Sequence, residues 1–208
     1  MRKEIEIIEI LKKQRPDAVS ELSWITPLDF MVAVILSAQA TDKGVNKITP
    51  RLFEKYKAVN DYLKISLEEL EKDISSINFF RTKAKRIKEA CNVIMNKFHG
   101  KIPQTMEELL TIPGLGRKSA NVILINVFDK IEGVVVDTHI TRVSQRLGLT
   151  KEKDAVKIER DLMKIYPKIY WAAVSHLFVL HGRYVCKSRK PDCVGCLINK
   201  YCPWYRPN

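Results

Sequence analysis

Apolar residues recur along most of the chain at intervals of three and four residues, the spacing of one face of an α-helix. The clearest case lies between residues 80 and 100, where Gly100 is expected to supply the carboxyl-terminal cap. One face of this segment carries Ile87, Ala90, Cys91, Ile94, Met95 and Phe98. The other face carries Lys83, Lys85, Arg86, Lys88 and Lys97, which we interpret as ordinary solvated residues, with contact to DNA as the alternative.

Capping and helix-breaking residues set the bounds of the other predicted elements. A helix beginning after Thr26 and running to Ala40 is apolar almost all round, so it should be central. Further helices are predicted over residues 3–13, 41–56, 138–147, 154–165 and 169–180, with a short one after Ser66 and with Gly182 ending the last. The valines at 134–136 have no strand-like partner and are interpreted as a buried extended linker. The expected fold class is all-α with about ten helices.

Residues 105–127 predict two helices joined by a tight hairpin. A capping box at Thr105 begins the first helix, and Pro113 with Gly114 ends it. Gly116 should allow the chain to enter the second helix at once. The two glycines leave backbone amides uncovered at the positive end of that helix, where a phosphate oxygen could bind. An ordinary turn between packed helices is the alternative, and the G-x-G pattern alone favours it.

Composition and charge restrict the class of protein and its partners. The 208 residues are 46% hydrophobic and 29% charged, which is typical of a globular protein. Lysine and arginine number 36 against 24 acidic residues, a net charge of +12 that favours nucleic acid as a partner and a membrane surface as the alternative. We find no membrane span and no signal peptide, and so expect a cytoplasmic protein.

Four of the five cysteines crowd into the last part of the chain, at Cys186, Cys193, Cys196 and Cys202. In an intracellular protein such a cluster indicates metal binding rather than disulfides. Zinc is the usual partner of four thiolates, but only the middle two cysteines are closely paired, and the uneven spacing suits an iron–sulfur cluster equally. Spacing alone leaves both open. Cys91 lies on an apolar helical face and is interpreted as core.

Beyond these patterns, the chain resembles the endonuclease III family, the bifunctional branch of the helix-hairpin-helix DNA glycosylases, over nearly its whole length. The resemblance rests on the cysteine spacing and on Leu-Ser-Ala-Gln-Ala-Thr-Asp at 36–42, Ile-Pro-Gly-Leu-Gly-Arg-Lys-Ser-Ala at 112–120, Val-Asp-Thr-His at 136–139 and Leu-His-Gly-Arg-Tyr at 180–184. It implies removal of oxidised or ring-damaged pyrimidines from duplex DNA, followed by strand cleavage at the abasic site.

The resemblance also implies an architecture. Residues 23–132 would form a six-helix barrel with the helix-hairpin-helix at about 106–127. Residues 1–22 and 133–208 would form an iron–sulfur domain with a [4Fe–4S] cluster on Cys186, Cys193, Cys196 and Cys202. Double-stranded DNA would bind in a cleft between the two, and the protein would act as a nucleoid-associated monomer.

Two residues would carry the chemistry that the resemblance implies. Lys118 matches the family's nucleophile: its amine would attack C1′ of the sugar and form a Schiff base, which permits β-elimination of the 3′ phosphate. Arg117 and the helix's positive end would both disfavour the charged amine. Asp137, which also reads as a helix cap, would stabilise positive charge on the sugar. His139 and His181 are interpreted as structural.

Other residues would open the duplex and hold DNA. Gln39 matches the family residue that enters the space left by the extruded base, and Phe79 matches a second wedge. Asn78 stands where the family usually has glycine, which leaves the base preference open. The predicted phosphate and DNA contacts are Gly114, Gly116, Arg117, Lys187, Arg189 and Lys190. The alternatives are a mismatch-specific glycosylase of the same fold, which typically lacks the lysine, and a non-catalytic DNA-binding module.

Overall fold

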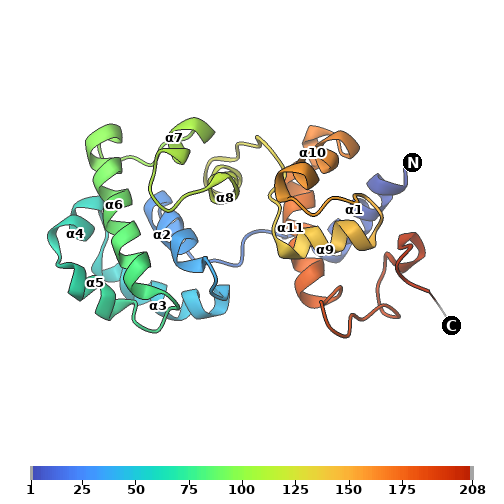
Figure 1. Ribbon diagram of the computed structural model, residues 1–208, viewed down its shortest axis with the longest axis horizontal. Coiled ribbons are helices and arrows are strands. Elements are labelled where there is room, and N and C mark those ends of the chain that lie inside the picture. The colour runs from blue at the N-terminus through green and yellow to red at the C-terminus, as the bar shows by residue number, and fades with distance from the viewer. Residues whose placement is uncertain (1, 207–208) are drawn as a thin grey trace. The chain divides into compact units, whose positions relative to one another are not determined.

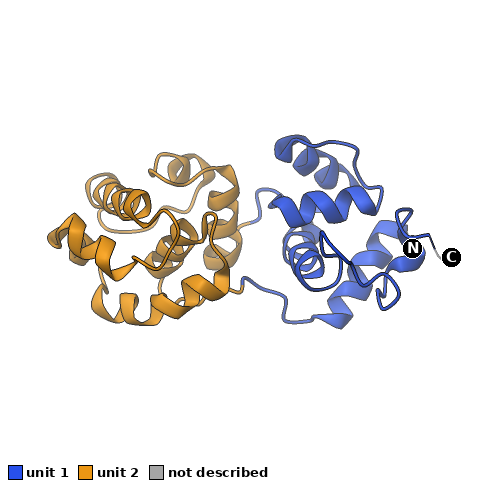
Figure 2. Ribbon diagram, turned by 60° about the horizontal axis from the view of Figure 1, so that its bottom comes forward, with its two compact units in different colours: residues 1–20, 131–208 blue, residues 21–130 orange. Residues whose placement is uncertain are grey.

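The computed structural model describes residues 2–206, and this part of the chain forms eleven α-helices and two short 3₁₀ helices with no strand (Figure 1). The all-α prediction is therefore confirmed. The chain divides into two compact units, each described here by itself (Figure 2). Unit 2 comprises residues 21–130, and unit 1 comprises residues 1–20 and 131–208. No helix of the described residues is both long and apolar enough to cross a membrane.

Unit 2 contains the helices α2 to α8. Their bounds are α2 Pro27–Ser37, α3 Asp42–Lys55, α4 Val59–Lys64, α5 Leu67–Asp73, α6 Phe80–Phe98, α7 Met106–Leu110 and α8 Arg117–Phe128. Unit 1 contains α1 Lys3–Gln14, α9 Thr138–Arg146, α10 Ala155–Ile165, α11 Trp171–Tyr184 and the 3₁₀ helices η1 Lys168–Tyr170 and η2 Asn199–Tyr201. The sequence analysis did not predict the six-residue helix α4. Its N-cap residue is Ala58, whose side chain cannot accept a hydrogen bond, so the usual capping signal is missing.

Helix α2 is the central element of unit 2, as its apolar sequence predicted. Residues 28–36 are all buried, and α2 packs against α3, α6 and α8 (Figure 1). Thr26 and Asp29 form a reciprocal capping box at its start. The predicted end at Ala40 is wrong, because the helix stops at Ser37 and the chain turns there, with the Ala40 N–H donating to the Ser37 carbonyl at 3.0 Å. Gln39 consequently lies in a turn rather than on a helix.

Helix α6 has the predicted apolar face, with Cys91 fully buried. Burial raises the pKa of the Cys91 thiol to about 12, as expected of a core residue. The interpretation of Lys83 as solvated is wrong: only 3% of the residue is exposed, and its Nζ donates to the Leu36 carbonyl at 2.8 Å. Lys88 is also half-buried. Carbonyl groups at helix ends lack partners within the helix, and a lysine stem can cross apolar surface to reach them.

Unit 1 is built around α11, which packs against α1, α9 and η1. Helix α10 forms within the predicted range 154–165, with Asp154 as its N-cap residue, and the valines at 134–136 are buried in an extended segment as predicted. The prediction that Gly182 ends the last helix is wrong, because α11 continues to Tyr184. A Cβ atom at Gly182 would lie 2.9 Å from the His139 Cβ atom. The glycine is therefore needed where α9 and α11 approach each other, not as a terminator.

Candidate functional site

The hairpin between α7 and α8 forms as predicted. Thr105 accepts from the Glu108 N–H at 3.3 Å, and its hydroxyl donates to the Glu108 carboxylate at 2.8 Å. After α7, the Leu115 N–H donates to the Ile112 carbonyl and closes the turn. The N-cap residue of α8 is Gly116, which has no side chain to accept from the first N–H groups of the helix. These groups are therefore left at the positive end of the helix, where an anion binds best.

The two glycines of the hairpin serve different purposes. Gly114 has φ +87°, a left-handed conformation that favours glycine, and a Cβ atom there would lie 3.3 Å from the side chain of Arg86. Gly116 has φ −103° and ψ 177°, which any residue adopts, and a Cβ atom there would meet nothing within 4 Å. The chain enters α8 directly after Gly116, as predicted, but this backbone conformation does not require glycine. Its missing side chain leaves open space in front of α8.

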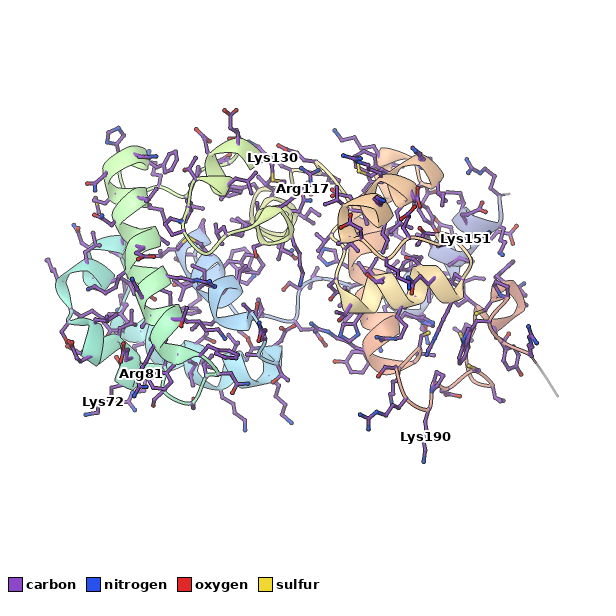
Figure 3. All side chains as sticks on the ribbon, in the orientation of Figure 1. Lys72, Arg81, Arg117, Lys130, Lys151 and Lys190 are labelled. Carbon is purple, nitrogen blue, oxygen red and sulfur yellow. The ribbon has the colours of Figure 1, made fainter. Side chains whose placement is uncertain are left out.

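Lys118 is the second residue of α8, and its side chain is exposed. It follows Arg117, the exposed first residue of the helix (Figure 3). The hairpin thus places an amine beside the open N–H groups of the helix. A ligand whose phosphate binds those groups would come within reach of the amine.

Asp137 is the N-cap residue of α9 in unit 1. Its Oδ1 atom accepts from the N–H groups of His139 at 2.8 Å and of Ile140 at 2.9 Å. Within residues 2–206 its Oδ2 atom has no hydrogen-bond partner of its own, and the side chain is half-buried. The cap therefore fixes the carboxylate while leaving one oxygen for another group. Asp137 and Lys118 belong to different units.

The two predicted wedge residues both occupy exposed positions of unit 2 with unusual backbones. Gln39 has φ 55° in the turn after α2, and Phe79 has φ 59° as the N-cap residue of α6. Phe79 is 63% exposed, which is high for a large apolar side chain. The Asn78 Nδ2 atom donates to the Gln39 carbonyl at 3.4 Å. The structure therefore joins the two segments that carry these residues, a link that the sequence did not predict.

The four clustered cysteines all line one cavity of unit 1. The pKa of Cys193 is raised, mainly by burial and to a smaller extent by the neighbouring Cys186 and Cys202. The pKa of Cys196 is also raised, again mainly by burial. Thiols whose pKa is raised, as at Cys193 and Cys196, give up their protons readily only to a cationic partner. The donor set therefore fits a thiolate-bound metal group.

The arrangement of the cysteines also bears on the kind of group. A zinc ion bound by four thiolates draws its sulfur atoms to about 3.8 Å from one another, given Zn–S bonds of about 2.3 Å. In the described part of the chain, no three His, Cys, Asp or Glu side chains gather closely enough to hold a single metal ion. Four thiols that line one cavity are a ligand set that both zinc and an iron–sulfur cluster use.

Two residues at this cavity were not predicted from the sequence. Arg146 donates from Nη1 to the Cys186 Sγ at 3.3 Å and to the Lys187 carbonyl at 2.8 Å, and its guanidinium lies 4.1 Å from the centre of the Trp204 ring. The His181 Nε2 atom lies 3.7 Å from the Cys196 Sγ, and burial lowers the pKa of His181 to about 4. A neutral His181 agrees with its structural interpretation. Only its place just before the cysteines could have indicated this contact.

The basic loop after Cys186 keeps its charges in solvent. Lys187, Arg189 and Lys190 are exposed, and Lys190 extends away from the ribbon (Figure 3). Arg146 also anchors the backbone of this loop, because its guanidinium donates to the Ser188 carbonyl at 3.3 Å. The loop therefore presents three cations on a backbone tied to the cysteine cavity.

Comparison with known proteins gives consistent matches. The sequence profile of the HhH-GPD superfamily of base excision DNA repair proteins matches residues 32–168. The endonuclease III of Synechocystis sp. is 50% identical over 198 residues, covering 95% of this chain and 90% of that protein. The endonuclease III of Bacillus subtilis is 43% identical over 188 residues, covering 90% of this chain and 85% of that protein.

Solved structures give the same result. A trapped covalent intermediate of an endonuclease III with DNA, in an estranged-adenine complex, is 40% identical, with a TM-score of 0.91 and coverage of 98% of this chain and 97% of that one. A non-covalent endonuclease III–DNA complex is also 40% identical, with a TM-score of 0.92 and coverage of 98% and 96%.

Proposed function

The chain belongs to the endonuclease III family, within the HhH-GPD superfamily of base excision DNA repair proteins, and on this premise we propose how its residues act on DNA. The protein is a DNA glycosylase and abasic-site lyase that acts on damaged pyrimidines in duplex DNA. The observation that carries the residue assignment is the exposed Lys118 at the open start of α8, in a chain similar throughout to one trapped covalently on DNA.

Lys118 is the nucleophile of the proposed reaction. Its Nζ forms a bond to C1′ as the glycosidic bond breaks and the base leaves with the bonding electron pair, which a proton then neutralises. Opening of the sugar ring gives an iminium between Nζ and C1′. Loss of a C2′ proton then expels the 3′ phosphate by β-elimination, and water hydrolyses the iminium to free the lysine. Only an amine among the common nucleophiles permits this second step.

Asp137 provides the fixed negative charge. The sugar gains positive character as the glycosidic bond breaks, so a carboxylate stabilises the transition state more than the ground state. The cap hydrogen bonds support this role, because they hold one oxygen in place and leave Oδ2 for the sugar or for the proton of Lys118. The proposal requires both side chains to act on the same nucleotide.

Gln39 and Phe79 are proposed to fill the duplex when the damaged nucleotide is extruded. Extrusion costs a few kcal/mol of stacking and pairing, which inserted side chains offset in part. The exposed Phe79 ring suits a wedge between bases, and the Gln39 amide can both donate to and accept from the orphaned base. Gly114, Gly116 and Arg117 would hold phosphates at the hairpin.

Cys186, Cys193, Cys196 and Cys202 are proposed to hold a [4Fe–4S] cluster. The cavity lined by all four thiols supports a thiolate-bound metal group, and membership of the endonuclease III family favours an iron–sulfur cluster over zinc. Such a cluster, when bound, would fasten the carboxyl-terminal segment by coordination. Lys187, Arg189 and Lys190 would then meet DNA phosphates. Iron and acid-labile sulfide analysis should give four of each per chain, and zinc in their place would contradict this assignment.

Borohydride trapping tests the assignment of Lys118. Borohydride reduces the iminium to a stable amine, so the wild-type protein should form a covalent adduct with DNA that contains an abasic site. Lys118→Gln should form no adduct while binding the same DNA. The matched control is Lys72→Gln, which removes one exposed lysine from α5 of the same unit, away from Arg117 (Figure 3), and should still be trapped.

The outcomes of the trapping experiment separate the alternatives. An adduct formed by Lys118→Gln would mean that the nucleophile is wrongly assigned. If the wild-type protein removed bases but gave no adduct, it would be a monofunctional glycosylase. If it bound DNA and neither removed bases nor formed an adduct, it would be a binding module.

A further inference from the structure

Lys83 is a buried lysine whose place in the core calls for an explanation. Only 3% of the residue is exposed, and within the described chain the one hydrogen bond of its side chain joins Nζ to the Leu36 carbonyl. Burial lowers the pKa of its amine, which shows the cost of placing an ammonium group there. An apolar side chain of similar length would fill the same space without that cost. We therefore attribute the presence of an amine here to its hydrogen bond with the Leu36 carbonyl.

The carbonyl that Lys83 holds belongs to the last turn of α2. Carbonyls at this end of a helix have no partner within the helix and carry its negative partial charge, so an ammonium group suits the position. Three residues after Leu36 comes Gln39, whose turn begins where α2 ends. The Lys83 side chain thus fixes the backbone from which Gln39 projects.

Lys83 also lies in the first turn of the helix that carries the other wedge. Its backbone N–H donates to the Phe79 carbonyl at 3.0 Å. Asn78, next to Phe79, makes the second cross-link through the Gln39 carbonyl at 3.4 Å. The buried Lys83 therefore holds the last turn of α2, and the exposed Asn78, just before α6, holds the turn that follows it.

Both wedge residues need such support, because their backbones are left-handed. This conformation costs about 1–2 kcal/mol for a residue with a side chain and persists only where the surroundings impose it. A turn released from α6 would relax, and Gln39 would lose its fixed relation to Phe79. The cost of opening the base stack is offset best when both side chains enter together.

We infer that Lys83 is a positioning residue for nucleotide extrusion: its buried amine joins the turn that carries Gln39 to the helix that carries Phe79, so that the two side chains enter the duplex as one rigid unit. This inference rests on the wedge roles proposed above. Lys83 itself touches neither DNA nor the reacting atoms.

The test compares two substitutions on the same helix. Lys83→Met keeps the length of the side chain and removes the donor. Lys88→Met is the matched control, because Lys88 also holds a helix end: its Nζ donates to the carbonyls of Tyr62, Leu63 and Ile65 around the end of α4. Both variants lose helix-end hydrogen bonds, and their melting temperatures should fall. Only Lys83→Met should affect the wedges.

The assay reports base unstacking directly. A fluorescent purine analogue is placed opposite the lesion, where its emission rises when the enzyme opens the stack. We expect Lys83→Met to reduce this rise and to slow single-turnover excision from duplex DNA about tenfold, the effect of losing one charge-assisted hydrogen bond. The slowing should exceed that of cleavage at an abasic site in single-stranded DNA, which has no stack to open. Lys88→Met should match wild type in fluorescence and excision.

Asn78→Ala provides a second test, since Asn78 is exposed and its loss does not threaten folding. It should reduce the fluorescence rise in the same direction, by a smaller factor. Gln39→Ala and Phe79→Ala separate the two levels of the proposal. If neither lowers the fluorescence rise, the wedge roles are wrong. If both lower it while Lys83→Met behaves like Lys88→Met, the wedges stand and the positioning role of Lys83 is overturned.

Discussion

Replacing Gly116 by alanine should weaken DNA binding without destabilising the protein. The structure gives two reasons to expect a normal fold: the backbone at Gly116 is extended, and a Cβ atom there would meet nothing within 4 Å. If the open space in front of α8 is where a phosphate approaches, an added methyl group would stand between that phosphate and the N–H groups. The substitution therefore separates binding from stability.

The expected magnitudes follow from these contacts. Alanine is a poorer N-cap residue than glycine by about 0.5 kcal/mol, while it stabilises by about 0.4–1 kcal/mol through the unfolded chain, so the net change should be close to zero. A hydrogen bond from a backbone N–H to a charged phosphate contributes about 1.5–3 kcal/mol. Losing one such bond should weaken binding by about 10- to 100-fold.

Gly114→Ala is the matched comparison, because it adds the same methyl group two residues earlier. There φ is +87°, and the new Cβ atom would press on Arg86 at 3.3 Å. We expect Gly114→Ala to lower the free energy of unfolding by about 1–2 kcal/mol, the cost of a left-handed alanine. Thermal or urea unfolding measures stability, and fluorescence anisotropy with an abasic-site duplex measures binding, both at one salt concentration.

DNA binding by Gly116→Ala as tight as that of the wild-type protein would refute a phosphate site in front of α8. The space in front of α8 would then be ordinary solvent, and the hairpin a plain turn between two helices. A Gly116→Ala protein that unfolded as readily as Gly114→Ala would contradict the structural argument instead, because nothing in the described fold occupies the position of the added methyl group.

Three further predictions concern other parts of the protein. Burial alone would raise the pKa of Asp73, but hydrogen bonds from Lys55 and Tyr56 outweigh it and lower that pKa below its usual value. Asp73→Asn should therefore cost about 1 kcal/mol of unfolding free energy at pH 7, and the difference should vanish in acid unfolding as pH falls through the lowered pKa; a constant difference would contradict this. Cys193→Ser should lose bound iron and melt at a lower temperature, whereas Cys91→Ala should keep its iron; equal iron contents would remove Cys193 from the ligands. Finally, log K for DNA binding should fall linearly with log salt, by about 0.9 per phosphate contacted, and a flat response would argue against phosphate binding.

The sequence alone determined the features that depend on neighbours in the chain. Caps such as Thr26 and Asp137 act on N–H groups two or three residues away, so both were identified correctly. The periodic apolar face of α6 was equally clear. The place of Lys118 at the start of a helix also follows from a local signal, the Pro-Gly turn before it. The catalytic assignments rest on the resemblance to the endonuclease III family.

Tertiary structure decided the features that depend on distant segments. A lysine in an amphipathic helix looks solvated until a helix end from elsewhere in the chain needs a donor, as happens at Lys83. From the sequence, Gly182 is interpreted as the end of a helix, but in the fold it allows α9 to pack closely against α11. Arg146 has the sequence context of a surface residue, but in the fold it donates to Cys186 and Lys187. Capping and periodicity rules describe interactions between residues a few positions apart. The cost of burying a charged group, in contrast, is offset only by contacts with distant segments, which form when the chain folds. That is why the helices could be predicted from the chain, while the support behind the wedges and the cysteines became visible only in three dimensions.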